Sequence, residues 1–166
     1  MTRFERALKY MLKNEGGLSD DPDDLGGATE HGGITSRFHP VTFWKVRRAK
    51  TPEERDTIIH DFYLKKYWNK LYNLISSERL AIRLFDLGVN LGVKRAVRLL
   101  QTTINENSDY HLTVDGIFGK NTLNAVNKTN VYQAYKDKVK EYYESRSTFW
   151  KFGRGWLRRL NRLISL

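Results

Sequence analysis

The first fifteen residues carry apolar side chains at helical spacing, and this apolar stripe ends at the carboxyl of Glu15. The stripe carries Phe4, Leu8 and Met11, which precede the acid by eleven, seven and four residues and so share its helix face. Thr2, with a glutamate three residues later, is a capping box that starts this helix, which we expect to run to about residue 14. Two glycines follow the acid and stop the helix. A chain that begins this way must fold around helices, and it points one acid along the face that should be buried.

Helical periodicity continues through most of the sequence. Thr51, followed by a proline and two acids, predicts the start of a second helix. Ser77 can cap a third, which should bend or break near Gly92 before a fourth begins. Further helices are expected over three stretches, 123–126, 131–142 and 156–164. Residues 18–36 are rich in acids and glycine and should form a loop, with a short β-hairpin.

Composition describes a folded chain of 166 residues, 40% of them hydrophobic, with a mean hydropathy of -0.61. It has no cysteine, and its four histidines lack the spacing of metal ligands, so we expect no metal and no cofactor. Alternating charges at the N-terminus argue against a signal peptide, and no apolar run is long enough to span a membrane.

The net charge of +10 and a pI of about 9.8 predict a polyanionic partner, which could be nucleic acid, an anionic membrane or a cell-wall polymer. Near the C-terminus, arginines between residues 154 and 162 alternate with large apolar side chains, as in an amphipathic helix. No nucleic-acid motif is evident, so we expect no nucleic-acid partner. This basic helix is a candidate for contact with anionic membranes.

Four motifs occur in order along the chain. They are Lys-Asn-Glu-Gly-Gly-Leu (13–18), Gly-Gly-Ile-Thr (32–35), Asp-Leu-Gly-Val-Asn (86–90) and Val-Asp-Gly-Ile-Phe-Gly (114–119). Together they resemble glycoside hydrolase family 108, the phage and prophage N-acetylmuramidases with a Glu-Gly-Gly motif. The resemblance implies a mainly α, lysozyme-like fold with a small loop or β-hairpin region after the first helix. It also implies an N-terminal muramidase lobe, 1–92, and a C-terminal helical lobe, 93–166, that resembles a peptidoglycan-binding region and packs on the first as one compact unit.

Glu15 is the candidate general acid. Hydrolysis of a glycosidic bond requires a protonated carboxyl at the leaving oxygen, and partial desolvation on an apolar helix face favours the neutral form. The alternative is a helix-terminal acid paired with a lysine. The flanking glycines and the family resemblance favour catalysis.

The second carboxylate should be ionised and more solvated. Asp24, nine residues after Glu15, is the first candidate, and Asp20, Asp21 and Asp23 compete with it. The distance between the two acids would decide between retention and inversion. The alternative is that all four acids solvate a turn; a calcium loop fits poorly, because the run lacks alternating ligands.

Four further residues are candidates for substrate binding. Thr35 could hold the second carboxylate or its water, unless it belongs to a surface turn. Asn90 could bind an acetamido group, because an amide both donates and accepts. Tyr63 and Trp68, together with Tyr67, could stack on sugars, although aromatic residues at helical spacing are usually core.

The predicted function is a peptidoglycan hydrolase, an endolysin of the lysozyme type, that cleaves the β-1,4 bond between N-acetylmuramic acid and N-acetylglucosamine for bacterial lysis. A lytic transglycosylase, a non-catalytic peptidoglycan-binding or secretion accessory protein, and a DNA-binding protein are the alternatives. We expect a monomer that accumulates in the host cytoplasm, is released with the help of a holin, and acts on glycan strands in the periplasm and cell wall.

Overall fold

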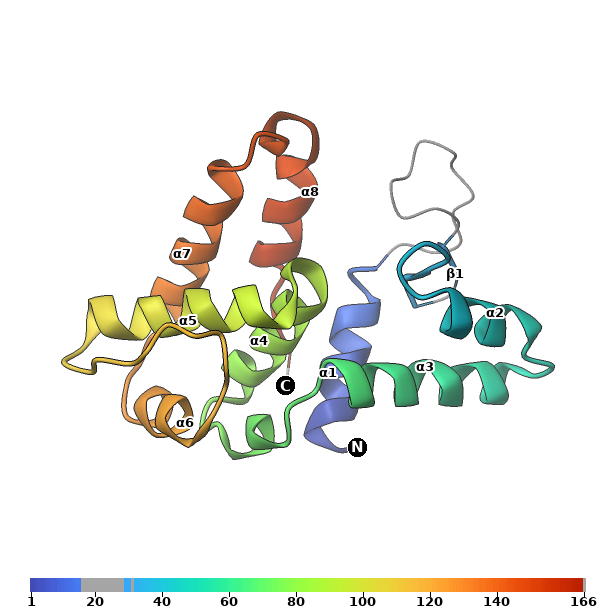
Figure 1. Cartoon of the computed structure of the whole chain (residues 1–166), viewed down its shortest axis with the longest axis horizontal. Coiled ribbons are helices and arrows are strands. Elements are labelled where there is room, and N and C mark those ends of the chain that lie inside the picture. Colours follow the sequence, from blue (N-terminus) through green and yellow to red (C-terminus); the bar gives the residue numbers. More distant parts are fainter. Residues whose placement is uncertain (16–28, 31, 166) are drawn as a thin grey trace. The chain divides into compact units, whose positions relative to one another are not determined.

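The capping residues start helices where the sequence predicts them. In the computed structural model, which describes residues 1–15, 29–30 and 32–165, the Thr2 side chain accepts from the Glu5 amide and starts α1 (Arg3–Leu12). Thr51 caps α3 (Pro52–Lys66), and Ser77 caps α4 (Glu78–Leu91). The mainly α, lysozyme-like fold is confirmed, because helices account for most of the described chain (Figure 1).

Residues 1–68 form the first of two compact units, Met1–Trp68 and Asn69–Leu166. In this unit α1 contacts α3, and α2 (Pro40–Arg48) lies along α3. Two short strands, β1 (Thr29–Glu30) and β2 (Ile34–Thr35), pair antiparallel and pack on α2, which confirms the predicted hairpin. The core consists of apolar residues from all three helices and β2: Phe4, Ala7, Leu8, Met11, Ile34, Phe43, Val46, Ile59 and Tyr63.

The second unit begins with a short 3-10 helix, η1 (Lys70–Leu74), and is centred on α4, whose residues 80–88 are all buried. Gly92 has φ +88, a backbone conformation suited to glycine, and there α4 ends and α5 (Val93–Asn107) begins. After α6 (Lys120–Asn127), α7 (Tyr132–Glu144) and α8 (Phe149–Asn161) lie side by side (Figure 1). The last helix therefore begins and ends earlier than the predicted stretch of 156–164.

The loop before α6 has no regular structure, yet two side-chain amides of α5, the buried Gln101 and the partly buried Asn105, hold it to that helix. Gln101 Nε2 donates to Asp115 Oδ1 at 2.9 Å and to the Ile117 carbonyl at 3.1 Å, and its Oε1 accepts from the Gly116 amide at 2.9 Å. Asn105 binds both main-chain groups of Leu112, at 2.7 and 2.8 Å. These bonds replace the ladder that a helix or strand would supply.

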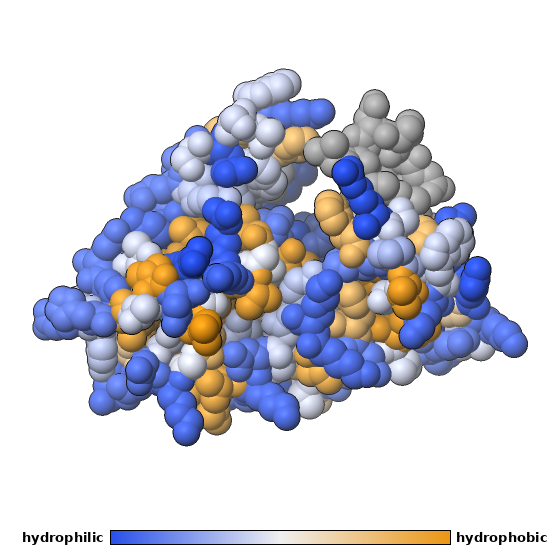
Figure 2. Space-filling view, in the orientation of Figure 1, coloured by the Kyte–Doolittle hydropathy of each residue, from blue (hydrophilic) through white to orange (hydrophobic). Residues whose placement is uncertain are grey.

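Hydrophilic residues spread over most of the face drawn in Figure 2, and apolar residues reach the surface in separate patches. Within the described residues, no helix is both long and apolar enough to cross a membrane. The predicted division into lobes 1–92 and 93–166, and their packing into one compact unit, stay predictions.

Candidate active site

Glu15 lies just beyond the end of α1. The helix ends at Leu12, and one more main-chain bond, from the Glu15 amide to the Met11 carbonyl at 3.2 Å, continues the turn. Phe4, Leu8 and Met11 are all buried, whereas Glu15 is partly exposed. The apolar stripe therefore leads to the acid as predicted, and the acid lies where the helix leaves the core.

The turn between β1 and β2 lies directly against the Glu15 side chain. Gly33 has φ +72, and a Cβ built on it would lie 2.7 Å from Glu15 Oε2 and 2.9 Å from Glu15 Cγ. A Cβ at these distances would force the Glu15 side chain or the turn to shift, so glycine is the residue that fits this contact without displacement. The second glycine of the Gly-Gly-Ile-Thr motif thus lets the main chain rest on the carboxyl.

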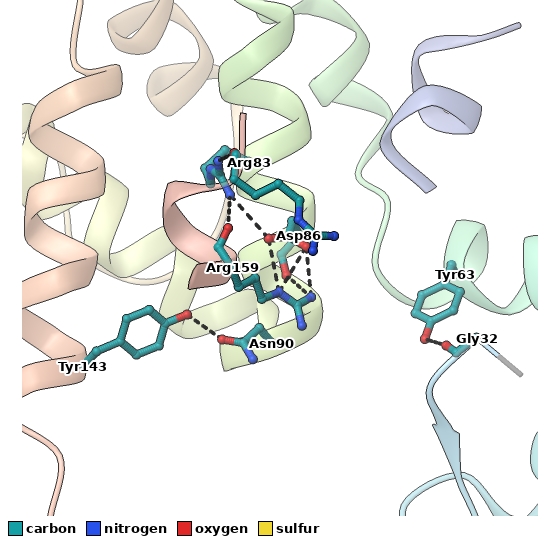
Figure 3. A network of polar contacts seen from close by, with 8 residues as sticks. Gly32, Tyr63, Arg83, Asp86, Asn90, Tyr143 and Arg159 are labelled. Carbon is teal, nitrogen blue, oxygen red and sulfur yellow. Dashed lines mark hydrogen bonds and ion pairs between the residues drawn. The ribbon is translucent and has the colours of Figure 1, made fainter. Parts of the chain in front are cut away.

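Helix α3 fixes the neighbouring glycine. The Tyr63 hydroxyl donates to the Gly32 carbonyl (Figure 3). A Cβ on Gly32, whose φ is +81, would lie 3.1 Å from Ile59 Cγ2 and 3.4 Å from Leu12 Cδ2. The hairpin turn therefore packs between α1 and α3 at Gly32, and its second glycine, Gly33, contacts the Glu15 side chain.

Tyr63 and Trp68 were candidates for stacking on a sugar, with a place in the core as the alternative, and their burial favours the core. Tyr63 exposes 2% of its surface, and Trp68 exposes 9% and packs against Phe4 with ring centroids 5.4 Å apart. A buried ring has no free face on which a sugar could stack. Tyr63 instead positions the turn that touches Glu15.

Three polar side chains, those of Lys66, His39 and Tyr67, form a chain of contacts near this turn. Lys66 Nζ lies 3.0 Å from His39 Nδ1, and the Tyr67 hydroxyl lies 3.4 Å from His39 Nε2. Because an ammonium group can only donate, Nδ1 must accept, and a neutral His39 then carries its proton on Nε2. Burial, followed by the positive charge of Lys66, lowers the pKa of His39 and favours this neutral form.

Tyr67 lies within the electrostatic reach of Glu15. Burial raises the pKa of the half-buried Tyr67 hydroxyl, and the negative charge of Glu15 raises it further. Since His39 Nε2–H points at the Tyr67 oxygen, the hydroxyl proton of Tyr67 is left to donate elsewhere. The sequence marked Tyr67 as an aromatic residue at helical spacing and gave no signal for His39.

Of the candidates Thr35 and Asp24, the structure describes only Thr35. Thr35 stands in β2, and its buried hydroxyl has no hydrogen-bond partner within the part of the chain that the structure describes. Asp24, like the competing Asp20, Asp21 and Asp23, lies outside the described residues. The roles assigned to all five stay predictions.

Asn90 belongs to the second unit, where its amide is held by α7. Asn90 Oδ1 accepts from the Tyr143 hydroxyl at 2.6 Å (Figure 3). This bond gives the amide oxygen of Asn90 a partner within the second unit. The amide nitrogen is the part of Asn90 that retains its donors for a ligand.

A buried ion pair joins α4 to α8 one turn before Asn90. Arg159 Nη2 donates to Asp86 Oδ1 at 2.9 Å, and Asp86 is fully buried. Arg83, also buried, lies 3.7 Å from the same carboxylate and donates to the main-chain carbonyls of Arg159 and Arg162. The end of α8 is thus anchored on the helix that carries Asn90 (Figure 3).

No group of three or more His, Cys, Asp or Glu side chains within residues 1–15, 29–30 and 32–165 is arranged to hold a metal ion. The site therefore offers a carboxyl against the main chain of the hairpin turn, with the tyrosine, histidine and lysine side chains of Tyr67, His39 and Lys66 nearby.

Comparison with known proteins identifies the family of the chain. The family described as glycosyl hydrolase 108 matches residues 8–92, and one described as predicted peptidoglycan domain matches residues 95–161. The solved structure of Brucella abortus SagA is similar with a TM-score of 0.73 and 30% identity, over 96% of this chain and 90% of that one. No curated protein sequence matches significantly. The chain belongs to the glycosyl hydrolase 108 family, a peptidoglycan hydrolase family.

Proposed function

We propose that the protein hydrolyses the β-1,4 bond between N-acetylmuramic acid and N-acetylglucosamine, with Glu15 as general acid. The observation that carries this proposal is the contact between Glu15 and Gly33. A carboxyl that merely ended a helix would not require a glycine at positive φ against its oxygen. The fixed turn instead restrains the carboxyl in one orientation, as proton transfer to a leaving oxygen requires.

The reaction needs a second group. A carboxylate must hold a water or stabilise the positive charge that develops on the sugar ring. Asp24 is our first candidate, with Asp20, Asp21 and Asp23 as alternatives, and Thr35 is the candidate that orients this carboxylate or its water. The Thr35 hydroxyl, in strand β2 of the hairpin, has no hydrogen-bond partner among the described residues, which is compatible with that role.

We assign retention on the wall to the second unit, which contains the predicted peptidoglycan domain. Asn90 is our candidate for an acetamido group, since its nitrogen can donate while Tyr143 holds its oxygen. A separate contact with anionic membranes is proposed for α8, which exposes Trp150 and Phe152 beside Lys151 and Arg154.

The biological role that we propose is bacterial lysis by a monomeric endolysin. The enzyme would be made in the host cytoplasm, pass to the wall with the help of a holin, and cut glycan strands there. Wall cutting that serves protein export is the alternative role.

Glu15→Gln tests the catalytic assignment. The amide keeps the size of the side chain but cannot deliver a proton, so the clearing of a suspension of purified walls should slow by about 10²- to 10⁴-fold. Sedimentation of the variant with walls should be unchanged. Glu144→Gln is the matched control, because it removes a half-exposed acid whose ion pair with Lys140, at 3.8 Å, is of the weak surface kind.

Undiminished clearing by Glu15→Gln would show that Glu15 is not the general acid. Wall binding without clearing by the unmodified protein would favour a non-catalytic binding protein. A product with a 1,6-anhydro muramic end would favour a lytic transglycosylase, which also uses one acid.

A further inference from the structure

The positive charge of the chain belongs almost entirely to the second unit. Residues 69–166 contain 17 Lys and Arg against 8 Asp and Glu, whereas residues 1–68 contain 12 against 11. The net charge is therefore +9 in the second unit and +1 in the first. A surface that recognises an anion should be sought in the second unit.

Four of the eight acids of this unit form ion pairs away from the start of α5. Lys138 pairs with Glu106 at 2.7 Å and with Glu141 at 3.2 Å. Lys140 pairs with Glu144, and the buried Asp86 pairs with Arg159. The basic residues at the beginning of α5 take no part in these pairs; Asp115, in the loop before α6, lies within electrostatic reach of Arg98 but forms no ion pair with it.

A groove of about 450 Å³ lies between the first turns of α5 and Tyr142 of α7. Its basic side chains are Lys94, Arg95 and Arg98, all exposed and at the spacing that places them on neighbouring parts of one helix. None of the three forms an ion pair with any described residue, and no acid lines the groove. Leu99 contributes to an apolar wall.

Two of these basic side chains are held in place. The Arg95 guanidinium lies 5.0 Å from the centroid of the Tyr142 ring, a cation-π contact that orients it. Gly116, in the loop pinned by Gln101, approaches α5 so closely that a Cβ on it would lie 2.5 Å from Lys94 Cγ. The loop therefore backs the stem of Lys94, and the groove is at least partly formed before a ligand arrives.

From this geometry we propose that the groove binds the free carboxylates of peptidoglycan stem peptides. Guanidinium groups match carboxylates in shape and charge, and the apolar wall suits alanine side chains. A neutral glycan would make little use of three unpaired cations, and a cavity of this size accepts a few residues of peptide but not a nucleic-acid duplex. The inference rests on the proposed function, because it makes the stem peptide a second point of contact with the same polymer.

The test uses the full-length Glu15→Gln protein and a synthetic stem pentapeptide, L-Ala-γ-D-Glu-diaminopimelate-D-Ala-D-Ala, in calorimetric titrations. The same peptide with every carboxyl amidated is the ligand control. Arg95→Gln/Arg98→Gln is the groove variant, and Arg79→Gln/Lys128→Gln is its matched control, because it also removes two exposed positive charges of this unit. Far-ultraviolet circular dichroism verifies that both variants are folded.

We expect the free peptide to bind, the amidated peptide not to bind, and the groove variant to lose about tenfold or more in affinity while its control stays within about twofold. No binding of the free peptide, or equal losses in the two variants, would overturn the proposal. So would groove-dependent binding of duplex DNA with unaltered binding of the peptide. Wall clearing by the active enzyme is measured separately, so a negative result for the groove would not contradict the role of Glu15.

Discussion

Replacing Gly33 by alanine should lower the catalytic rate by displacing Glu15, an effect that can be distinguished from the loss of folding stability. The added methyl would lie 2.7 Å from Glu15 Oε2, whereas ordinary contacts begin at 3.4 Å. The carboxyl or the turn must therefore move by about 0.7 Å. The turn resists movement because the Tyr63 hydroxyl holds the adjacent Gly32, so most of the displacement should fall on the acid.

The magnitudes follow from these contacts. A misplacement of about 1 Å costs up to roughly a hundredfold in rate, so we expect kcat to fall about 10- to 100-fold with little change in wall binding. Alanine at φ +72 also costs about 1–2 kcal/mol of folding free energy. For a chain of this length, that loss lowers the melting temperature by roughly 2–8 °C.

Gly92→Ala is the control, because it also places alanine at a positive φ, +88, but no atom lies within 4 Å of the added methyl. The rate is measured on a soluble muramyl glycan without stem peptides, and stability by thermal unfolding. Gly92→Ala should lose at least as much stability as Gly33→Ala and keep its rate, because its ψ of 138 lies outside the left-handed helical region. If Gly33→Ala kept its rate as well, the contact would not orient the acid, and the argument from Gly33 to Glu15 would fail.

Three more perturbations test the surrounding structure. Asp86→Asn should cost about 3–5 kcal/mol in chemical unfolding, because Arg159 and a second buried arginine lose their carboxylate; a loss under about 1 kcal/mol would show that the buried pair is dispensable. Gln101→Leu should cost at least about 2 kcal/mol and speed amide hydrogen exchange in residues 109–119, because it removes both the donors and the acceptor that hold that loop; unchanged exchange would contradict this role. The lowered pKa of His39 means that the unfolded chain takes up this proton at higher pH than the folded protein does, so stability should be lost as the pH falls below about 6.5. His39→Gln should flatten that part of the stability profile, and an unchanged slope would count against it.

Helix starts were predictable because their signals are local. Thr2, Thr51 and Ser77 each cap the first turn of their own helix, and Gly92 breaks the chain between α4 and α5 as its position suggested. Helix α2 was not predicted. Its surface carries exposed Val41 and Trp44, so the apolar pattern has no clean polar face.

The catalytic candidate Glu15 could be predicted from the sequence, whereas most of the residues that surround it could not. The stripe that ends at Glu15 could be read from spacing alone, but its contact with Gly33 joins segments eighteen residues apart through a turn. Tyr63 shows the limit of periodicity, since an aromatic residue at helical spacing fits both a core and a sugar platform. Its hydrogen bond to Gly32 gives it a third role, in positioning, that only the folded chain reveals.

Mass spectrometry of the muropeptides released in heavy-oxygen water tests the central claim most directly. Hydrolysis with Glu15 as acid should place one heavy oxygen on the reducing muramic end, and Glu15→Gln should abolish that product. A muramic end lighter by one water and free of the label, or labelled product of undiminished yield from Glu15→Gln, would contradict the account.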